Sequence, residues 1–112
     1  MALERGTLVL TGIERIPKTD IPQFAPGILL EGSNEGGWCD VVFGSAFPDF
    51  SSVSIRLHED ALIPLLVLPE EDRQLDPNAA LQQHWREAIK TLANFYLTTH
   101  RHVTELRNAL TV

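Results

Sequence analysis

Residues 27–43 read GILLEGSNEGGWCDVVF, with one short apolar run on each side of a glycine-rich stretch. Each run has the length of a β-strand, is rich in aliphatic and aromatic residues, and is bounded by turn formers. The glycines and Asn34 between the runs supply the positive-φ positions that a tight turn needs. We therefore predict a β-hairpin that joins residues 27–31 to residues 38–43.

A phosphate-binding loop is the alternative interpretation of the same glycines. Such a loop needs a helix after it, so that backbone N–H groups and the helix dipole converge on the anion. Here the loop leads into residues 38–43, which have the composition of a second strand, and no Lys or Arg occurs from residue 19 to residue 55. The sequence favours the turn.

Three more apolar runs of strand length precede residue 69, at residues 7–13, 53–58 and 62–68. In residues 53–58 the apolar and polar side chains alternate, which is typical of a strand with one buried face. In residues 62–68 the alternation is lost and Pro64 intervenes. This run is either a strand whose proline lies at a sheet edge or bulge, or an irregular apolar segment.

The C-terminal third has the longest periodic pattern. After an acidic connector at residues 69–76, Asp76 and Pro77 make a favourable helix start, because the carboxylate caps free N–H groups and proline fits the first turn. Apolar residues then recur at steps of three and four, with no glycine or further proline. We predict a largely continuous helix over residues 77–112. A break near residues 97–100 is the alternative, because threonines lower helix propensity there.

Together these patterns predict a single α+β domain in which residues 1–68 are β-rich. We expect a small bent antiparallel sheet, or a partial barrel, of four to five strands packed on the long C-terminal helix. The 112 residues are 44% hydrophobic and 21% charged, which is ordinary globular composition. No apolar run approaches the ~20 residues of a membrane span. Charged residues near the start argue against a signal peptide, so we expect a cytoplasmic location with no membrane contact.

The net charge of −6 argues against a general nucleic-acid binder, because such proteins cluster Lys and Arg. The charge is uneven along the chain. Residues 1–76 carry thirteen acidic and five basic residues, whereas residues 77–112 carry four basic and two acidic ones. This asymmetry predicts that the helix docks on the acidic part within the fold, and a partner-binding face is the alternative.

If the protein were an enzyme, its best catalytic candidates would be Cys39, Asp40 and His58. Cys39 alternates in phase with Val41 and Phe43, which predicts a buried and inert thiol with Asp40 on the opposite face. His58 lies on the polar side of its own strand, so a dyad of Cys39 with His58 is not favoured.

Metal binding is not expected either. His100 and His102 are two residues apart, which separates them by ~200° around a helix axis, and His84 does not repair that geometry. We therefore predict no catalytic residues, no cofactor and no metal site.

The length of the helix suggests a function. About 34 helical residues would span roughly 50 Å, against about 34 Å for a compact domain of this size. We therefore expect its far half to pack on a second copy or another protein. The prediction is a non-enzymatic protein–protein interaction or assembly module, either a self-associating adaptor or a small subunit of a complex. The expected interface consists of Trp85, Leu92, Phe95, Tyr96, Val103, Leu106 and Leu110. The alternatives are a small acidic inhibitor of a basic site, such as a phage or mobile-element product, and an unrecognised enzyme.

Overall fold

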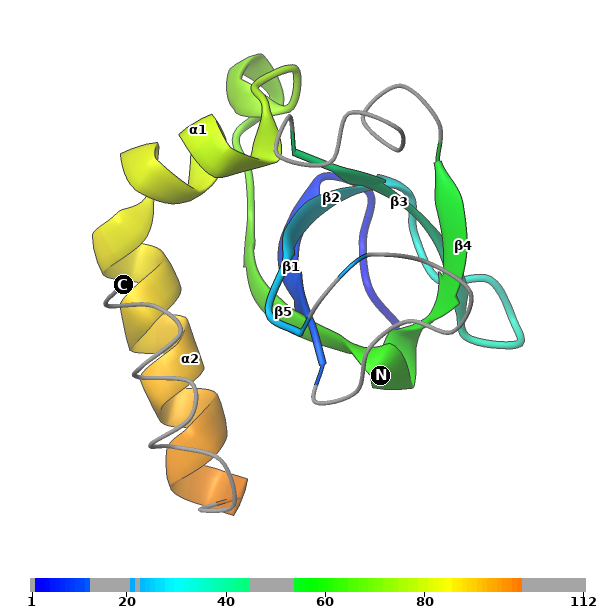
Figure 1. Cartoon of the computed structure of the whole chain (residues 1–112). Coiled ribbons are helices and arrows are strands. Elements are labelled where there is room, and N and C mark those ends of the chain that lie inside the picture. Colours follow the sequence, from blue (N-terminus) through cyan, green and yellow to red (C-terminus); the bar gives the residue numbers. More distant parts are fainter. Residues whose placement is uncertain (1, 13–20, 22, 45–53, 100–112) are drawn as a thin grey trace.

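The computed structural model of the chain describes residues 2–12, 21, 23–44 and 54–99, with side chains described through residue 94. One antiparallel sheet holds five strands, in the order β4-β3-β2-β1-β5 (Figure 1). The strands are β1 Thr7–Thr11, β2 Pro26–Glu31, β3 Trp38–Phe43, β4 Ile55–His58 and β5 Leu62–Val67. Two short 3-10 turns, η1 Glu59–Ala61 and η2 Glu70–Asp72, follow β4 and β5. The predicted α+β class, the antiparallel sheet and its number of strands are confirmed.

The sheet curls into an open trough that encloses an inner core (Figure 1). Two register irregularities assist the bend, one between Leu8 and Val9 on β1 and one between Leu29 and Glu31 on β2. Among the described strands β4 and β5 do not pair, so the sheet stays open. The buried residues of the inner core are Val9, Ile21, Ala25, Leu29, Cys39, Val41, Phe43, Leu57 and Leu62.

A second core lies on the outer face of the sheet, beneath helices α1 Pro77–Gln83 and α2 Trp85–Thr99. Helix α2 packs mainly on β5, and α1 contacts β1 and β2 (Figure 1). The buried residues of this outer core are Leu8, Leu10, Ile28, Ile63, Leu65, Leu68, Ala80, Ala88 and Leu92. The helices therefore cover the outer face over β5, β1 and the start of β2, and leave β3 and β4 uncovered on that side.

The helical segment differs from the prediction of a largely continuous helix. It begins as expected, with the Asp76 carboxylate accepting a hydrogen bond from the Asn78 N–H at 3.1 Å. It is then interrupted at His84, whose φ of −106° and ψ of 22° are not helical. Nε2 of His84 lies 3.0 Å from Oδ2 of Asp72, so a contact with the connector accompanies the interruption. Residues 100–112 and any overhang lie outside the described residues.

The apolar run around Pro64 is a strand. Pro64 lies on β5, which is at one end of the sheet order, and it pairs with Val9 beside the register shift of β1. Proline has no N–H, so it is tolerated in a sheet at an edge or a bulge, and this position offers both. Of the two alternatives for residues 62–68, the edge or bulge strand is therefore correct.

Candidate functional site

The uncovered part of the outer face is built by alternation along β3. Cys39, Val41 and Phe43 point inward and are each at most 1% exposed. The intervening residues Trp38, Asp40 and Val42 therefore project from the outer face. On this face the side chain of Trp38 is 46% exposed.

Leu30 of β2 joins the same face by alternation, because Ile28 belongs to the outer core and Leu29 to the inner core. Glu31 pairs with Asp40 and Leu29 pairs with Val41, so Leu30 is the extra residue between the two pairs. Its neighbour Leu29 is buried in the inner core, and Leu30 is 47% exposed. We call the surface formed by Leu30, Trp38, Asp40 and Val42 the β2–β3 face. Together with Val67 and Trp85, Leu30 and Trp38 are the large apolar residues exposed in the described part of the chain.

A groove adjoins the β2–β3 face on the side of the helices. It has a volume of about 320 Å³ and runs between the outer side of β2 and β3 and the segment that leads from η2 into α1. Its apolar lining comes from Ile28, Leu30, Val42, Phe43, Leu75 and Pro77. Its charged lining residues are Arg73 and Asp76, one of each sign. A single large aliphatic side chain of another molecule would fit this space.

His58 holds Trp38 from the neighbouring strand. The two residues are paired across β3 and β4, and their rings meet edge to face with centroids 5.2 Å apart. His58 Nδ1 accepts a hydrogen bond from the Asp60 N–H at 3.2 Å, and Nε2 donates to the Gly36 carbonyl at 3.0 Å. Both ring nitrogens are thus engaged, so His58 acts here as a structural support for the indole.

Acidic side chains border the β2–β3 face. Glu31 stands opposite Asp40, and Asp60 lies beside His58, with Oδ2 3.4 Å from Nδ1. Glu35 belongs to the turn that passes the indole, because a Cβ added at Gly36 would lie 3.2 Å from Cδ1 of Trp38. Glu31 and Glu35 make no ion pair with any described residue.

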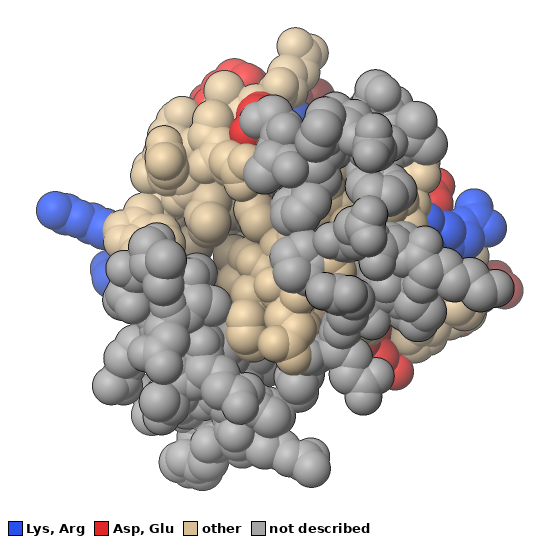
Figure 2. Space-filling view, in the orientation of Figure 1, with Lys and Arg blue, Asp and Glu red and all other residues tan. Residues whose placement is uncertain are grey.

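The cation within this border is already paired. Nε of Arg56 lies 3.3 Å from Oδ1 of Asp40, in an ion pair across β3 and β4. Figure 2 shows Lys and Arg side chains projecting at two opposite margins, one beside the helices and one near β4, where acidic side chains adjoin them. Among the described residues, four carboxylates against one guanidinium give the border of the β2–β3 face a negative charge.

The glycine-rich stretch is a turn, as predicted, and not a phosphate cradle. Oδ1 of Asn34 accepts hydrogen bonds from the N–H groups of Gly36 at 2.9 Å and Trp38 at 3.0 Å. Gly37 donates to the Asn34 carbonyl at 3.0 Å and has a φ of +84°. The turn is thus closed by its own asparagine, and these N–H groups are not available to an anion.

Cys39 lies on the opposite side of the sheet from His58, in the inner core. Its partner across β4 is Leu57, and its side chain is 1% exposed, which confirms the predicted register. Its Sγ atom lies 3.3 Å from Oγ of Ser33. The Ser33 hydroxyl donates to Oε2 of Glu59 at 2.7 Å and accepts from the Leu3 N–H at 2.8 Å.

Ser33 is therefore the residue that sequence reasoning missed at this place. Its single hydroxyl hydrogen is donated to Glu59, so in its contact with Cys39 the serine oxygen can only accept, and the Gly37 carbonyl, 4.0 Å from Sγ, is the other acceptor for the thiol. The hydrogen bonds join the N-terminal segment, the turn before β3 and η1. No sequence pattern indicates this cluster, because the partners lie 6, 26 and 30 residues from Ser33.

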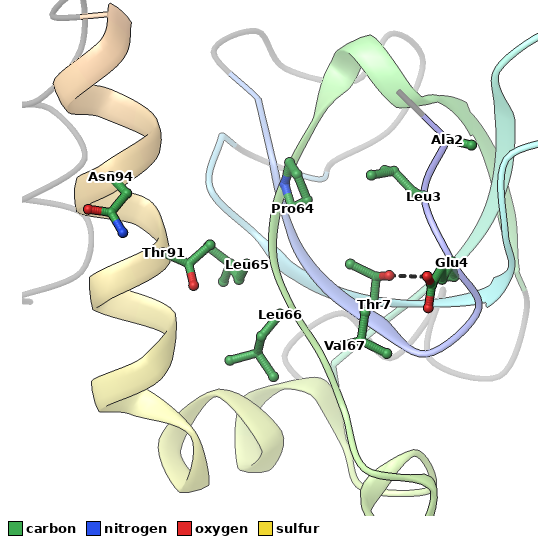
Figure 3. Close-up of a pocket in the computed structure, with 10 residues that line it drawn as sticks. All are labelled: Ala2, Leu3, Glu4, Thr7, Pro64, Leu65, Leu66, Val67, Thr91 and Asn94. Atoms are coloured by element: carbon green, nitrogen blue, oxygen red, sulfur yellow. Dashed lines mark hydrogen bonds between the residues drawn. The ribbon is translucent and has the colours of Figure 1, made fainter.

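A second groove separates β5 from α2 (Figure 3) and has a volume of about 460 Å³. Pro64, Leu66 and Val67 of β5 line it on one side, and Thr91 and Asn94 of α2 on the other. Pro64 on this edge strand has no N–H to donate, which disfavours pairing with a further strand. The rest of the lining consists of Ala2, Leu3, Thr7, Leu65 and one acid, Glu4, and it gives little indication of the chemistry of an occupant.

The residues predicted to form an interface differ in burial, and several of them are not described. Leu92 is 3% exposed and belongs to the outer core, so it is not part of the surface. Trp85 is 37% exposed at the start of α2. Phe95 and Tyr96 lie in α2, but their side chains are not among those described. Val103, Leu106 and Leu110 fall outside the described residues.

Within residues 2–12, 21, 23–44 and 54–99, no group of three or more His, Cys, Asp or Glu side chains is arranged to hold a metal ion. In the same part of the chain, no helix has both the length and the apolar character needed to cross a membrane. His100 and His102 lie outside this part.

Comparison of the chain with protein-family models, with curated protein sequences and with solved structures gives no match.

Proposed function

We propose that this protein is a protein–protein interaction module that binds its partner through the β2–β3 face. The observation that supports this proposal is the joint exposure of Trp38 and Leu30, at 46% and 47%, on a side of the sheet that neither helix covers. Soluble proteins keep few large apolar side chains together in water, and tryptophan is enriched among the residues that dominate binding energy.

The pairing of the polar groups supports a non-enzymatic role. Asp40 is held by Arg56, and both nitrogens of His58 are engaged. Cys39 is buried on the other face, where its neighbour Ser33 donates its hydrogen bond to Glu59. A nucleophile needs an adjacent base and access to substrate, and this arrangement offers Cys39 neither. An enzyme remains the third interpretation, without an observation in its favour.

The finer parts of the proposal extend beyond the β2–β3 face. We expect a cytoplasmic adaptor or assembly subunit, with a protein as partner and with no direct binding of nucleic acid or membrane. Self-association through residues 77–112 also remains a proposal, based on the apolar periodicity of residues 103–110.

A small acidic inhibitor is the second candidate function. The observation that favours it is the acidic border of the β2–β3 face, made by Glu31, Glu35, Asp40 and Asp60. An inhibitor of this kind would place the exposed indole in a basic site of its target. It is a special case of the proposed interaction module and uses the same surface.

Position-specific photo-crosslinking tests the proposed function. Benzoylphenylalanine would replace Leu30 on the β2–β3 face and, as a matched control, exposed Ala79 on α1. In cells that normally make the protein, we expect an adduct of one defined mass from position 30 and none from position 79. The Trp38→Ser substitution should remove this adduct. Equal labelling from both positions, or no effect of Trp38→Ser, would contradict the proposal.

A further inference from the structure

We infer that the partner of the β2–β3 face is a cationic peptide segment that carries an apolar anchor residue. This inference rests on the proposed function and adds to it the chemistry of the partner. The β2–β3 face combines three features: an exposed indole, an acidic border and an adjoining apolar groove. The indole and the acidic border both favour a cation in the segment that binds there, and the groove favours an apolar side chain.

The indole selects a cation. Trp38 meets His58 with its ring edge to face, at an interplanar angle of 87°, so the two rings are not stacked, and 46% of Trp38 is exposed. A guanidinium or ammonium group over the face of a tryptophan is attracted by the ring quadrupole, and the attraction is strongest for tryptophan among the aromatic residues. Among the described residues, Arg56 is the cation paired across β3 and β4 on this face, and its guanidinium is held by Asp40.

The acidic border also favours a positively charged segment. Glu31 follows the exposed Leu30, and Glu35 lies in the turn beside Trp38. Neither has an ion-pair partner among the described residues. Two such carboxylates at the rim of an apolar patch attract a basic partner and repel an acidic one, which sets specificity and the rate of association.

The groove selects an apolar side chain next to the cation. Leu30 and Val42 form one wall, and Leu75 and Pro77 form the other. Leu30 belongs both to the groove and to the β2–β3 face. One short peptide segment can therefore place an apolar side chain in the groove and a cation over Trp38. We therefore expect the segment that binds to contain a leucine or phenylalanine beside two or more Arg or Lys residues.

The experiment is a parallel selection from a random library of 12-residue peptides displayed on phage. One selection uses the wild-type protein and the other uses Trp38→Ser, after circular dichroism has shown that the variant is folded. We expect peptides enriched on wild type alone to be net basic and to contain a large apolar residue. Their synthetic versions should change the fluorescence of a Trp85→Phe protein, in which Trp38 is the single tryptophan.

Charge variants give the matched comparison and do not alter Trp38. Glu31→Lys combined with Glu35→Lys should weaken a selected peptide on the order of tenfold, because two attractive rim contacts become repulsive. Glu87→Lys makes the same substitution once, with half of that charge change, on α2, which packs on β5, and should leave affinity within about twofold. The charge variants also keep the inference testable if Trp38→Ser fails to fold.

The outcomes separate the inference from the function on which it rests. Peptides that require Trp38 but are neutral or acidic would overturn the cationic chemistry and leave the binding face intact. Peptides enriched equally on wild type and on folded Trp38→Ser would overturn both. The absence of any enriched peptide, or equal effects of the rim and α2 charge variants, would overturn the inference.

Discussion

The rings of Trp38 and His58 meet edge to face, with centroids 5.2 Å apart and an interplanar angle of 87°. The two residues are direct partners across β3 and β4, and His58 is also anchored to Gly36 and Asp60. The exposed indole is therefore positioned by a residue that is itself fixed at both ring nitrogens. A preorganised aromatic side chain loses little conformational entropy on binding, which suits the role proposed for Trp38.

His58→Ala is expected to lower the free energy of unfolding by about 1–2 kcal/mol. The substitution removes the edge-to-face contact, worth about 0.5–1.5 kcal/mol, and two hydrogen bonds at a partly exposed site. Urea denaturation followed by circular dichroism measures the change. Arg56→Ala on the same strand is the control and should cost under about 1 kcal/mol, because it breaks one exposed ion pair. A larger loss for Arg56→Ala than for His58→Ala would contradict this assignment.

The Cys39 thiol is expected to react with dithiobis(nitrobenzoate) roughly a hundredfold more slowly in the native protein than in urea. At 1% exposure, labelling of the native protein requires opening of the inner core. The absorbance of the released thiolate measures both rates, and the unfolded chain is its own control. Immediate stoichiometric labelling of folded protein would show that the inner core is open at β3.

Ser33→Ala is expected to destabilise the fold by about 1–3 kcal/mol. The substitution leaves the Leu3 N–H, the Cys39 thiol and a Glu59 oxygen without their shared partner in a partly buried place. Thermal and urea denaturation measure the effect. Ser54→Ala, at an exposed serine just before β4, makes the same chemical change and should be neutral within about 0.5 kcal/mol. Equal stabilities of the two variants would show that the Ser33 cluster contributes nothing.

Gly37→Ala is expected to cost more stability than Gly36→Ala, by about 1–2 kcal/mol. Gly37 has a φ of +84°, and an added Cβ would lie 2.7 Å from Nε2 of His58. At Gly36 the φ is not in the left-handed region, and the nearest atom is 3.2 Å away, on the exposed Trp38 ring. Chemical denaturation of both variants makes the comparison. A larger cost at Gly36 would mean that the turn differs from the one described.

Two variants with leucine substitutions separate the domain core from the proposed self-association. Leu92→Ala should destabilise the fold by about 2–5 kcal/mol, because Leu92 is 3% exposed in the outer core. Leu106→Glu combined with Leu110→Glu should instead dissociate an oligomer and leave the sheet folded, if residues 103–110 form a contact between copies. Light scattering measures mass, and circular dichroism measures folding.

A wild-type protein of monomeric mass across micromolar concentrations would refute self-association. If the double variant at positions 106 and 110 unfolded, these leucines would belong to the core of the domain instead.

The sequence by itself determined the local structure. The alternation of residues 38–43 placed Cys39, Val41 and Phe43 on one side of a strand, Asn34 with its glycines closed the turn, and Asp76 with Pro77 began the helix. Each of these signals depends on neighbours a few residues apart, through side-chain period, backbone φ and capping. The number of strands, the antiparallel sheet and the register of Cys39 could therefore be predicted.

Only the tertiary structure decided which surfaces remain in water and which distant groups meet. Trp38 and Leu30 lie in apolar runs, and their exposure follows from helices that cover β5, β1 and the start of β2 and leave this part of the outer face uncovered. The interruption of the helix at His84 coincides with a contact to Asp72, twelve residues earlier. Burial and long-range pairing depend on the whole arrangement of elements, whereas side-chain periodicity reports only the local conformation of the chain.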